Sequence, residues 1–399
     1  MNTVGSHRRW ASAAAAALSV LLCAWAGVAW AQTQLPTPSP DVWAQDMREA
    51  VHRTPVTVSD LFGREETRQL PVTVFRPAGD GPHPLVVFNH GRAVGDKRAH
   101  QGRARYEHAV RYLVGKGFVV MVPTRIGYWE TFGDFDPEQS GPCRQRNFAP
   151  MHRAVSDQVL ATVAYAHTLP YVDASRWIVA GQSVGGLSAV ATVGRQPPGL
   201  LAGISFSGGS GGSPDANPGR PCNPEALGQH WAGLARNAQV PMLWLYWRGD
   251  KYWGDDVPRQ WHRAWVDGGG RAEFHQFAAL KGDGHSGLDR DMDRWLPVVD
   301  AFLAQLGFTQ PAIQPRPPAT GWAEVDDDTR VPLSLRARAD GYRKFLAADA
   351  PRAFAIGAQG AWGYATADYV TGRALGFCQR SGQTCQLYAV DDDVVWPGR

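Results

Sequence analysis

The segment Gly181-Gln182-Ser183-Val184-Gly185-Gly186 restricts the possible folds of this chain more than any other. It follows an apolar, strand-like run at residues 177–180 and precedes a helix predicted over residues 184–193. A serine flanked by glycines at such a strand-to-helix turn is typical of a catalytic nucleophile, because the crowded turn leaves no room for neighbouring side chains. The start of the following helix also favours a developing negative charge. A glycine-rich turn with a purely structural role is the alternative interpretation.

The sequence around this turn alternates between strand-like and helix-like runs. Strands are predicted at residues 56–60, 70–75, 85–88, 118–122, 177–180, 204–206, 242–247 and 272–277, and helices at residues 103–116, 152–169, 184–193, 258–266 and 291–306. Two strands followed by alternating strands and helices predict an α/β fold, with a mostly parallel central sheet and helices on both faces.

The first 31 residues have the features of an export signal. Arg8 and Arg9 precede an apolar stretch over residues 11–31, which ends in Ala29-Trp30-Ala31. An uncleaved membrane anchor and lipidation of Cys23 are the alternatives. We predict cleavage after residue 31 and a periplasmic or secreted protein.

Two proline-rich stretches suggest how the rest of the chain is organised. We divide it into a signal peptide (1–31), a linker (32–49), an α/β catalytic domain (50–307), a proline-rich linker (308–321) and a small α+β C-terminal module (322–399). Aspartate runs at residues 326–328 and 391–393 are interpreted as solvated turns, so we predict no metal site.

Charge and hydropathy exclude several classes of protein. The net charge is +3, and without Arg8 and Arg9 it falls to about +1, which gives no support for binding to nucleic acid. No apolar run of 18 residues follows the leader, so we expect no stable membrane insertion after signal removal. The sequence does not indicate an oligomeric state.

Four cysteines remain once Cys23 is removed with the leader: Cys143, Cys222, Cys378 and Cys385. An even number in an exported chain favours disulfides, and four cysteines allow three connectivities. The close pair Cys378 and Cys385 is expected to form a local bridge, which leaves Cys143 to pair with Cys222.

A serine nucleophile requires a base and an acid that orients the base. Asp250 lies just past the strand at 242–247, and His285 lies in a glycine-rich loop after the strand at 272–277. Both therefore fall at the carboxyl ends of later strands, where such partners occur in the order Ser, acid, His. The alternatives are Asp255, Asp256 and Asp283 for the acid, and His230, His262 and His275 for the base.

An oxyanion formed at Ser183 would need two backbone donors. One candidate is the N–H of Val184, directly after the serine, and the other is the N–H of Arg92, after the strand at 85–88. Gly91 would allow the close approach. The His90 side chain is interpreted as structural.

Together these motifs resemble the α/β-hydrolase superfamily, and within it the dienelactone-hydrolase-like and secreted serine esterase branch. The resemblance covers residues from about 50 to 307 and is carried by residues 88–91, 173–176 and 181–186, the strand ending at Asp250, and Gly284-His285. True dienelactone hydrolases have a cysteine nucleophile where this chain has Ser183. That departure favours ordinary serine esterase chemistry over a dienelactone substrate.

The resemblance implies a mechanism without a cofactor. Ser183 would attack an acyl carbonyl, His285 would accept its proton, and Asp250 would stabilise the imidazolium. The sequence thus predicts an exported serine hydrolase, a carboxylic ester hydrolase that cleaves small-molecule esters or lactones through an acyl-enzyme. A peptidase or amidase with the same triad, or a binding protein that kept the fold without catalysis, are the alternatives.

Two features carry less information. Tyr128, Trp129, Tyr252 and Trp253 are candidates for an acyl or aromatic pocket, with ordinary packing as the alternative. The C-terminal module resembles a small Cys-paired domain found in exported bacterial proteins, and this resemblance implies no activity.

Overall fold

The computed structural model describes residues 44, 47–312, 319–349, 352–366 and 370–398. The predicted signal peptide, most of the first linker and the centre of the second linker lie outside the described residues. Among the described helices, none combines the length and the apolar character that crossing a membrane requires.

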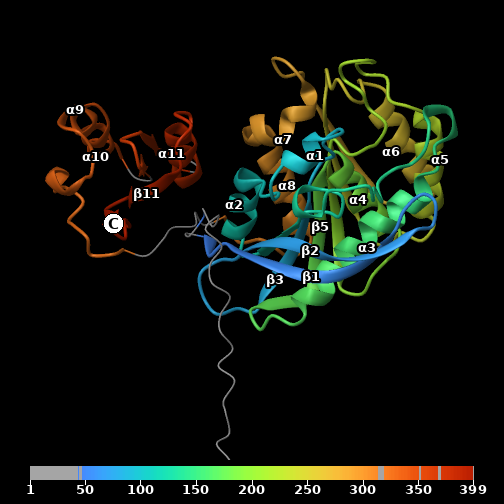
Figure 1. Ribbon diagram of the computed structural model, residues 1–399, viewed down its shortest axis with the longest axis horizontal. Helices are drawn as coiled ribbons and strands as arrows, with labels where there is room; N and C mark the ends of the chain where they lie inside the picture. The colour runs from blue at the N-terminus through green and yellow to red at the C-terminus, as the bar shows by residue number, and fades with distance from the viewer. Residues whose placement is uncertain (1–43, 45–46, 313–318, 350–351, 367–369, 399) are drawn as a thin grey trace, which may run out of the picture. The chain divides into compact units, whose positions relative to one another are not determined.

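An eight-stranded sheet has the order β1-β2-β4-β3-β5-β6-β7-β8 (Figure 1). Its strands are β1 (Ala50–Ser59), β2 (Glu65–Phe75), β3 (His83–Asn89), β4 (Val119–Pro123), β5 (Val172–Gln182), β6 (Leu200–Phe206), β7 (Met242–Trp247) and β8 (Ala272–Phe277). β2 pairs antiparallel with β1 and β4, and the remaining neighbours are parallel. This strand order is that of the α/β-hydrolase fold and confirms the predicted fold class.

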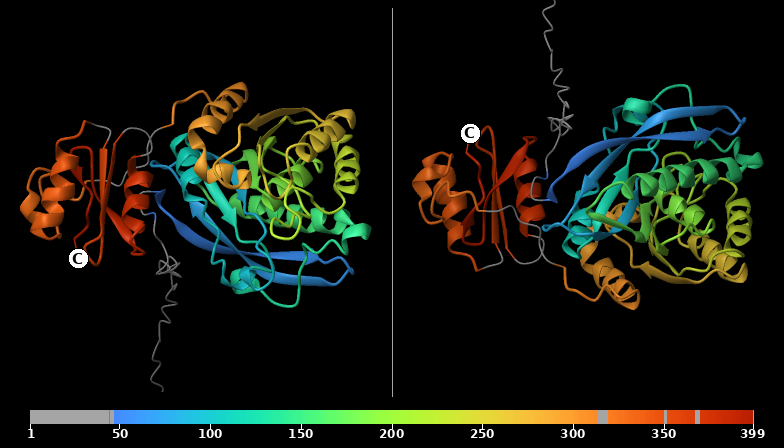
Figure 2. Two further views of the ribbon diagram at one scale, coloured as in Figure 1. Left: turned by 90° about the horizontal axis from the view of Figure 1, so that it is seen from above. Right: turned by 90° about the horizontal axis from the view of Figure 1, so that it is seen from below.

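Helices cover both faces of this sheet (Figure 2). On one face lie α2 (Glu107–Gly115) and α8 (Met292–Gln305), and on the other lie α3 (Phe148–Ala166), α4 (Val184–Val193), α5 (Pro224–Ala235) and α6 (Val257–Asp267). The central strand β3 shows why: Leu85 and Val87 join the core on one face, whereas Val86 and Phe88 join the core on the other. A strand that is buried on both faces has a continuous apolar sequence, and β3 could be predicted for this reason.

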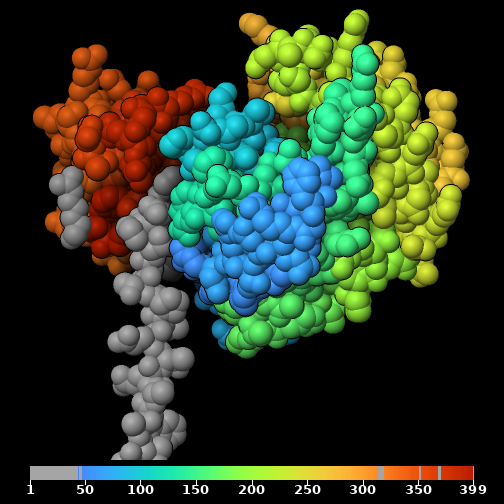
Figure 3. Space-filling model, turned by 45° about the vertical axis from the view of Figure 1, so that its right-hand side comes forward, coloured from blue at the N-terminus to red at the C-terminus, as the bar shows by residue number. Residues whose placement is uncertain are grey.

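The β1–β2 hairpin extends further than predicted. Val56 and Val58 of β1 are buried, but the neighbouring side chains and the first half of β2 point to solvent. The hairpin contributes to the outer surface, where it appears in blue in Figure 3. Its exposed half has no apolar pattern, so the sequence indicated only the buried half of each strand.

Residues 319–398 contain a second, antiparallel sheet of order β10-β9-β11-β12. Its elements are β9 (Arg352–Gly357), β10 (Trp362–Thr366), α11 (Val370–Gln379), β11 (Cys385–Val390) and β12 (Asp393–Val394), with short helical segments η5 (Asp328–Arg330), α9 (Leu335–Ala337), η6 (Arg338–Tyr342) and α10 (Arg343–Leu346) before them. The sheet has its own two apolar clusters, one of which includes the buried face of α11. This agrees with the predicted α+β module, while the domain boundaries stay a prediction.

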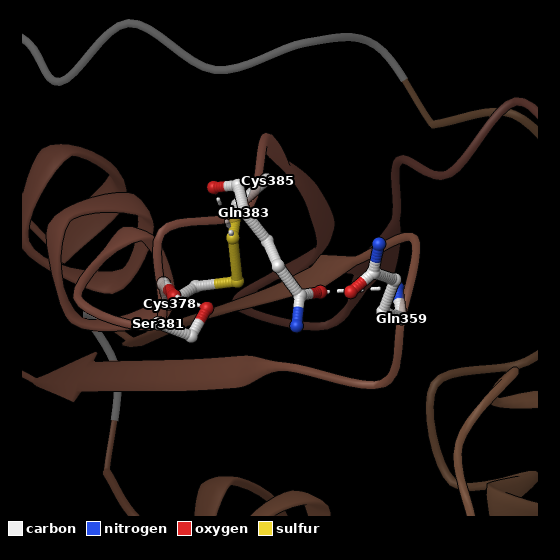
Figure 4. Close-up of a disulfide and its surroundings, with 5 residues drawn as sticks. All are labelled: Gln359, Cys378, Ser381, Gln383 and Cys385. Carbon is white, nitrogen blue, oxygen red and sulfur yellow. Dashed lines mark hydrogen bonds between the residues drawn. A yellow bond between two sulfur atoms is a disulfide. The ribbon is translucent and has the colours of Figure 1, made fainter.

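The bridge between Cys378 and Cys385 joins the end of α11 to the start of β11 (Figure 4). The turn between them is held by the Ser381 hydroxyl, which donates to the Cys378 carbonyl at 2.8 Å. Gln383 accepts the N–H of Gln359 at 3.0 Å and so ties this turn to the hairpin that follows β9. The predicted local disulfide is therefore present.

Candidate active site

Ser183 occupies the sharp turn between β5 and α4. Its backbone has φ 59° and ψ −122°, a left-handed conformation that costs a non-glycine residue free energy and is typical of functional sites. A Cβ on Gly181 would lie 2.4 Å from the Gly185 carbonyl, and one on Gly185 would lie 2.0 Å from the Asn89 carbonyl. Only glycine fits at both positions, so the motif forms the strand–turn–helix geometry that the sequence predicted.

Asp250 and His285 form a buried pair at the ends of β7 and β8. The Nδ1 of His285 lies 2.9 Å from Oδ2 of Asp250, and their side chains are 10% and 0% exposed. The other carboxylate oxygen of Asp250 accepts the N–H groups of Tyr252 at 2.7 Å and Trp253 at 3.1 Å. With Nδ1–H donated to Asp250, the Nε2 of His285 is left as the basic nitrogen.

The loop that carries His285 is fixed by a second acid. Asp283 accepts the N–H groups of His285 and Lys251, each at 2.9 Å, through the same carboxylate oxygen. The Tyr252 ring stacks on the imidazole at 4.0 Å between centroids, and the Trp253 ring meets it edge-on at 5.5 Å. Asp283 thus orients the loop backbone rather than the imidazole.

Ser183 and His285 line one cavity of about 460 Å³. The cavity is lined by His90, Gly91, Arg92, Ala93, Gln101, Arg103, Ala104, Arg105, Tyr106, Gln182, Ser183, Tyr252, His285 and Asp289. The structure therefore brings the predicted nucleophile and base together with Arg92, and Val184 follows Ser183 as the first residue of α4. The first N–H groups of a helix have no acceptor within the helix, and they point out of its N-terminal end.

Of the four aromatic residues predicted for the pocket, Tyr252 lines the cavity and the others do not. Tyr128 is buried and donates its hydroxyl to Glu138 at 2.6 Å. Trp253 is buried behind the His285 ring, with its indole N–H on the Ser207 carbonyl at 2.7 Å. Trp129 is half-buried in the short turn η2 (Trp129–Thr131). The last three side chains are used in packing, the alternative that the sequence left open.

His275, His262, Asp255 and Asp256, which were alternatives for the base and the acid, have other surroundings. His275 has a side chain that is 39% exposed on β8, and His262 contacts the Ala272 carbonyl from α6 at 2.9 Å. Asp255 accepts the N–H of Gly249 at 2.8 Å. Asp256 stands at the start of α6 without a capping hydrogen bond from its side chain.

His90 holds the backbone of the loop after β3. Its Nε2 accepts the N–H of Arg125 at 2.9 Å, and its Nδ1–H donates to the Gly91 carbonyl at 2.6 Å. Burial, together with the nearby Arg125 guanidinium, lowers the pKa of His90 to about 3. A neutral imidazole bonded on both nitrogens supports the structural role that was expected for this side chain.

An ion cluster that the sequence did not reveal supports the same loop, and two of its members, Arg125 and Glu138, are fully buried. Arg92 pairs with Asp136 at 2.6 Å and with Glu138 at 3.0 Å, and Arg125 pairs with Glu138 at 2.5 Å. Burial by itself would raise the pKa of Glu138, but Arg125 and Arg92 lower it to about 2. We call Arg92, Arg125, Asp136 and Glu138 the Glu138 cluster. It fixes the side chain of Arg92, a residue that lines the cavity.

A disulfide joins two segments that follow strands of the large sheet. Cys143, in the short turn η3 (Cys143–Gln145) after β4, is bonded to Cys222 in the segment after β6, with 5.1 Å between their Cα atoms. The pairing predicted from the cysteine count is present. Within the part of the chain that the structure describes, no group of three or more His, Cys, Asp or Glu side chains is arranged to hold a metal ion.

Several residues of the cavity wall were not predicted from the sequence, among them Tyr106 and Gln182. The helix predicted from residue 103 begins at Glu107, and Tyr106 precedes it with φ 50°. Because Tyr106 and Val110 are four residues apart, a helical spacing, Tyr106 was predicted to lie inside the helix. Gln182 stands inside the serine motif and could have been singled out by its place next to Ser183.

No protein-family model matches the chain, and no curated protein matches it. Among solved structures, a protein described as a dienelactone hydrolase from Klebsiella pneumoniae is 18% identical, with 64% of this chain and 99% of that chain covered and a TM-score of 0.42. An esterase from Thermogutta terrifontis is 17% identical over 65% of this chain and 96% of its own, with a TM-score of 0.43. An acylaminoacyl peptidase from Pyrococcus horikoshii is 18% identical over 65% of this chain, with a TM-score of 0.45, and only 42% of the peptidase chain is covered.

Proposed function

We propose that this protein is a serine hydrolase that cleaves carboxylic esters or lactones through an acyl-enzyme, with residues 50–307 as its catalytic domain. One observation carries the proposal: Ser183 and His285 line the same cavity, and His285 is bonded through Nδ1 to the buried carboxylate of Asp250. A nucleophile, a base and an acid that orients the base are the parts that acyl transfer requires.

In this mechanism Ser183 attacks the substrate carbonyl while the Nε2 of His285 takes the hydroxyl proton. Asp250 accepts Nδ1–H throughout and stabilises the imidazolium that forms. The N–H groups of Val184 and Arg92 bind the oxyanion of the tetrahedral intermediate. His285 then protonates the leaving alcohol. In the second half of the reaction water attacks the carbonyl of the acyl-enzyme, His285 takes a proton from the water, and that proton returns to Ser183 as the carboxylic acid leaves.

The lining of the cavity favours small, polar substrates. Among the described residues that line it, the aliphatic side chains are those of Ala93 and Ala104, and the aromatic rings belong to residues with polar groups. A long acyl chain would gain little from such a wall, because its methylene groups would find few apolar partners. We therefore propose substrates with a short acyl group.

We also propose that the protein is exported, to the periplasm or beyond. The two disulfides, Cys143–Cys222 and Cys378–Cys385, support this because such bonds persist mainly in oxidising compartments. The N-terminal residue of the protein recovered from cells would test the predicted cleavage, and a start at Gln32 is expected.

A fluorophosphonate probe tests the catalytic proposal, because it reacts with activated serines. We expect stoichiometric labelling at Ser183, with no labelling of Ser183→Ala and no hydrolysis of p-nitrophenyl acetate by that variant. The folded protein failing to react at Ser183 would favour a binding protein without catalysis. Hydrolysis of the matching p-nitroanilide at a comparable rate would favour an amidase.

A further inference from the structure

The Tyr106 hydroxyl joins three loops that meet at the cavity. It accepts the N–H of Gly91 at 2.9 Å and donates to Oε1 of Gln182 at 3.0 Å. Gln182 in turn donates from Nε2 to the backbone carbonyl of His285 at 3.1 Å. A single chain of hydrogen bonds thus runs from the loop before Arg92, past the residue next to Ser183, to the loop of the histidine.

The surroundings of Tyr106 keep this chain in one arrangement. Its ring packs on Phe88 at 5.0 Å between centroids, and burial raises the pKa of its hydroxyl to about 12, so the phenol remains protonated and both donates and accepts. Its left-handed φ of 50° is a strained conformation for a tyrosine. Such strain is typical of a residue whose position matters to function.

The loops that this chain connects are in close contact. A Cβ on Gly91 would lie 3.3 Å from Oε1 of Gln182 and 3.3 Å from the Cβ of Ser183. A small shift of the Gly91 peptide would therefore change where the N–H of the next residue, Arg92, points relative to Ser183.

We propose that Tyr106 and Gln182 are positioning residues, which set the geometry between the oxyanion N–H of Arg92, the serine turn and the His285 loop. The inference rests on the proposed serine hydrolase function. Because the chain acts on the alignment of reacting groups, its loss should weaken stabilisation of the transition state and leave binding of the ground-state ester almost unchanged.

The test is Tyr106→Phe, which removes the hydroxyl and keeps the ring. With p-nitrophenyl acetate we expect kcat to fall by about 10²-fold, as small misplacements of reacting groups do. We expect KM to stay within about twofold of the wild-type value. The affinity for phenylboronic acid, which forms a tetrahedral adduct with the serine, should fall along with kcat. Gln182→Met breaks the same chain of hydrogen bonds at its other residue, and it should also lower kcat and the affinity for phenylboronic acid.

Tyr112→Phe is the matched control. Tyr112 lies in α2 and donates its hydroxyl to Asp300 at 2.9 Å, and it is not part of the cavity wall. This variant loses a tyrosine hydroxyl close in sequence, and it should keep wild-type kcat and boronate affinity. Near-ultraviolet circular dichroism of all three variants separates misfolding from misalignment.

Two results would overturn the inference. Wild-type kcat in both Tyr106→Phe and Gln182→Met, or a change confined to KM, would show that the chain only supports the fold or the binding of substrate. If the wild type itself shows no turnover that depends on Ser183, the proposed function fails, and the positioning role fails with it. The wild-type assay thus distinguishes the two failures.

Discussion

Asp250 binds His285 through one oxygen of its carboxylate: Oδ2 lies 2.9 Å from the imidazole Nδ1, whereas Oδ1 accepts two backbone N–H groups. The two N–H groups fix the plane of the carboxylate, so the direction of its bond to the imidazole is set before substrate arrives. Since both side chains are buried, water does not compete for this bond.

The first prediction concerns this bond. In Asp250→Asn the amide cannot act as a charged acceptor, and it favours the wrong tautomer of His285. We expect kcat for p-nitrophenyl acetate to fall by about 10⁴-fold, the scale seen when a triad acid is replaced by its amide. Asp256→Asn, an exposed change nearby, is the control and should keep full activity. Retention of more than a tenth of wild-type kcat in Asp250→Asn would contradict the role of this acid.

The parts of the structure that could be predicted are those with a local signal. The strands at 242–247 and 272–277 and the helix at 184–193 have the bounds that the sequence indicated. The first of these strands is buried along its whole length and therefore forms a continuous apolar run bounded by turn residues. Asp250 and His285 could be singled out because parallel strands bring their carboxyl ends to one edge of the sheet. Their catalytic roles stay a prediction.

Other parts depend on contacts that a sequence window does not contain. Helix α5 begins at an Asn223 cap and buries Leu227 and Trp231, but its glycines and polar residues weaken the pattern. Tyr106 meets Gln182 across 76 positions of sequence, and only the folded turn places it at the cavity. The acids of the Glu138 cluster pair with Arg92 across 44 and 46 positions of sequence, which no local pattern indicates.

The second prediction concerns acyl-chain length. The described residues of the cavity wall include no large aliphatic side chain, so each added methylene should gain little of the roughly 1–3 kcal/mol that an apolar pocket gives. We expect kcat/KM to be as high for p-nitrophenyl acetate or propionate as for any longer ester, with no rise toward octanoate. The same series with Ser183→Ala gives the uncatalysed background. A rise in kcat/KM with chain length would contradict a short, polar acyl site.

The third prediction concerns acid stability. Burial lowers the pKa of both His90 and His152 to about 3, whereas in the unfolded chain each would titrate near about 6.5. The unfolded state therefore binds more protons below pH 6.5, and the free energy of unfolding should fall as the pH is lowered from there. The slope of the unfolding free energy against pH, measured by urea unfolding near pH 5, should be smaller in His152→Gln than in the wild type by about 1.4 kcal/mol per pH unit. An unchanged slope would show that His152 is not buried in its neutral form.

The fourth prediction compares the two disulfides. Cys143–Cys222 closes a span of 79 residues and Cys378–Cys385 one of 7. Because each bridge lowers the entropy of the unfolded chain, the first should stabilise the folded protein by about 4.5 kcal/mol and the second by about 2.5 kcal/mol. Replacing each pair by alanines and measuring urea unfolding should show the larger loss for Cys143 and Cys222. Free thiols at these two positions in the purified protein, detected by mass after alkylation, would refute the bond itself.

The fifth prediction separates a buried charge from an exposed one of the same type. Glu138 and its partner Arg125 are both 0% exposed, so Glu138→Gln leaves buried guanidinium charge without its carboxylate and should cost about 3–5 kcal/mol of unfolding free energy. Glu130→Gln is the matched control, because Glu130 pairs with Arg53 where their side chains are 37% and 48% exposed, and it should cost at most about 1 kcal/mol. Since Arg125 also binds the His90 carbonyl beside the oxyanion loop, Glu138→Gln should lower kcat as well, whereas Glu130→Gln should not. Equal losses of stability in the two variants would mean that the Glu138 cluster is no more than a surface ion pair.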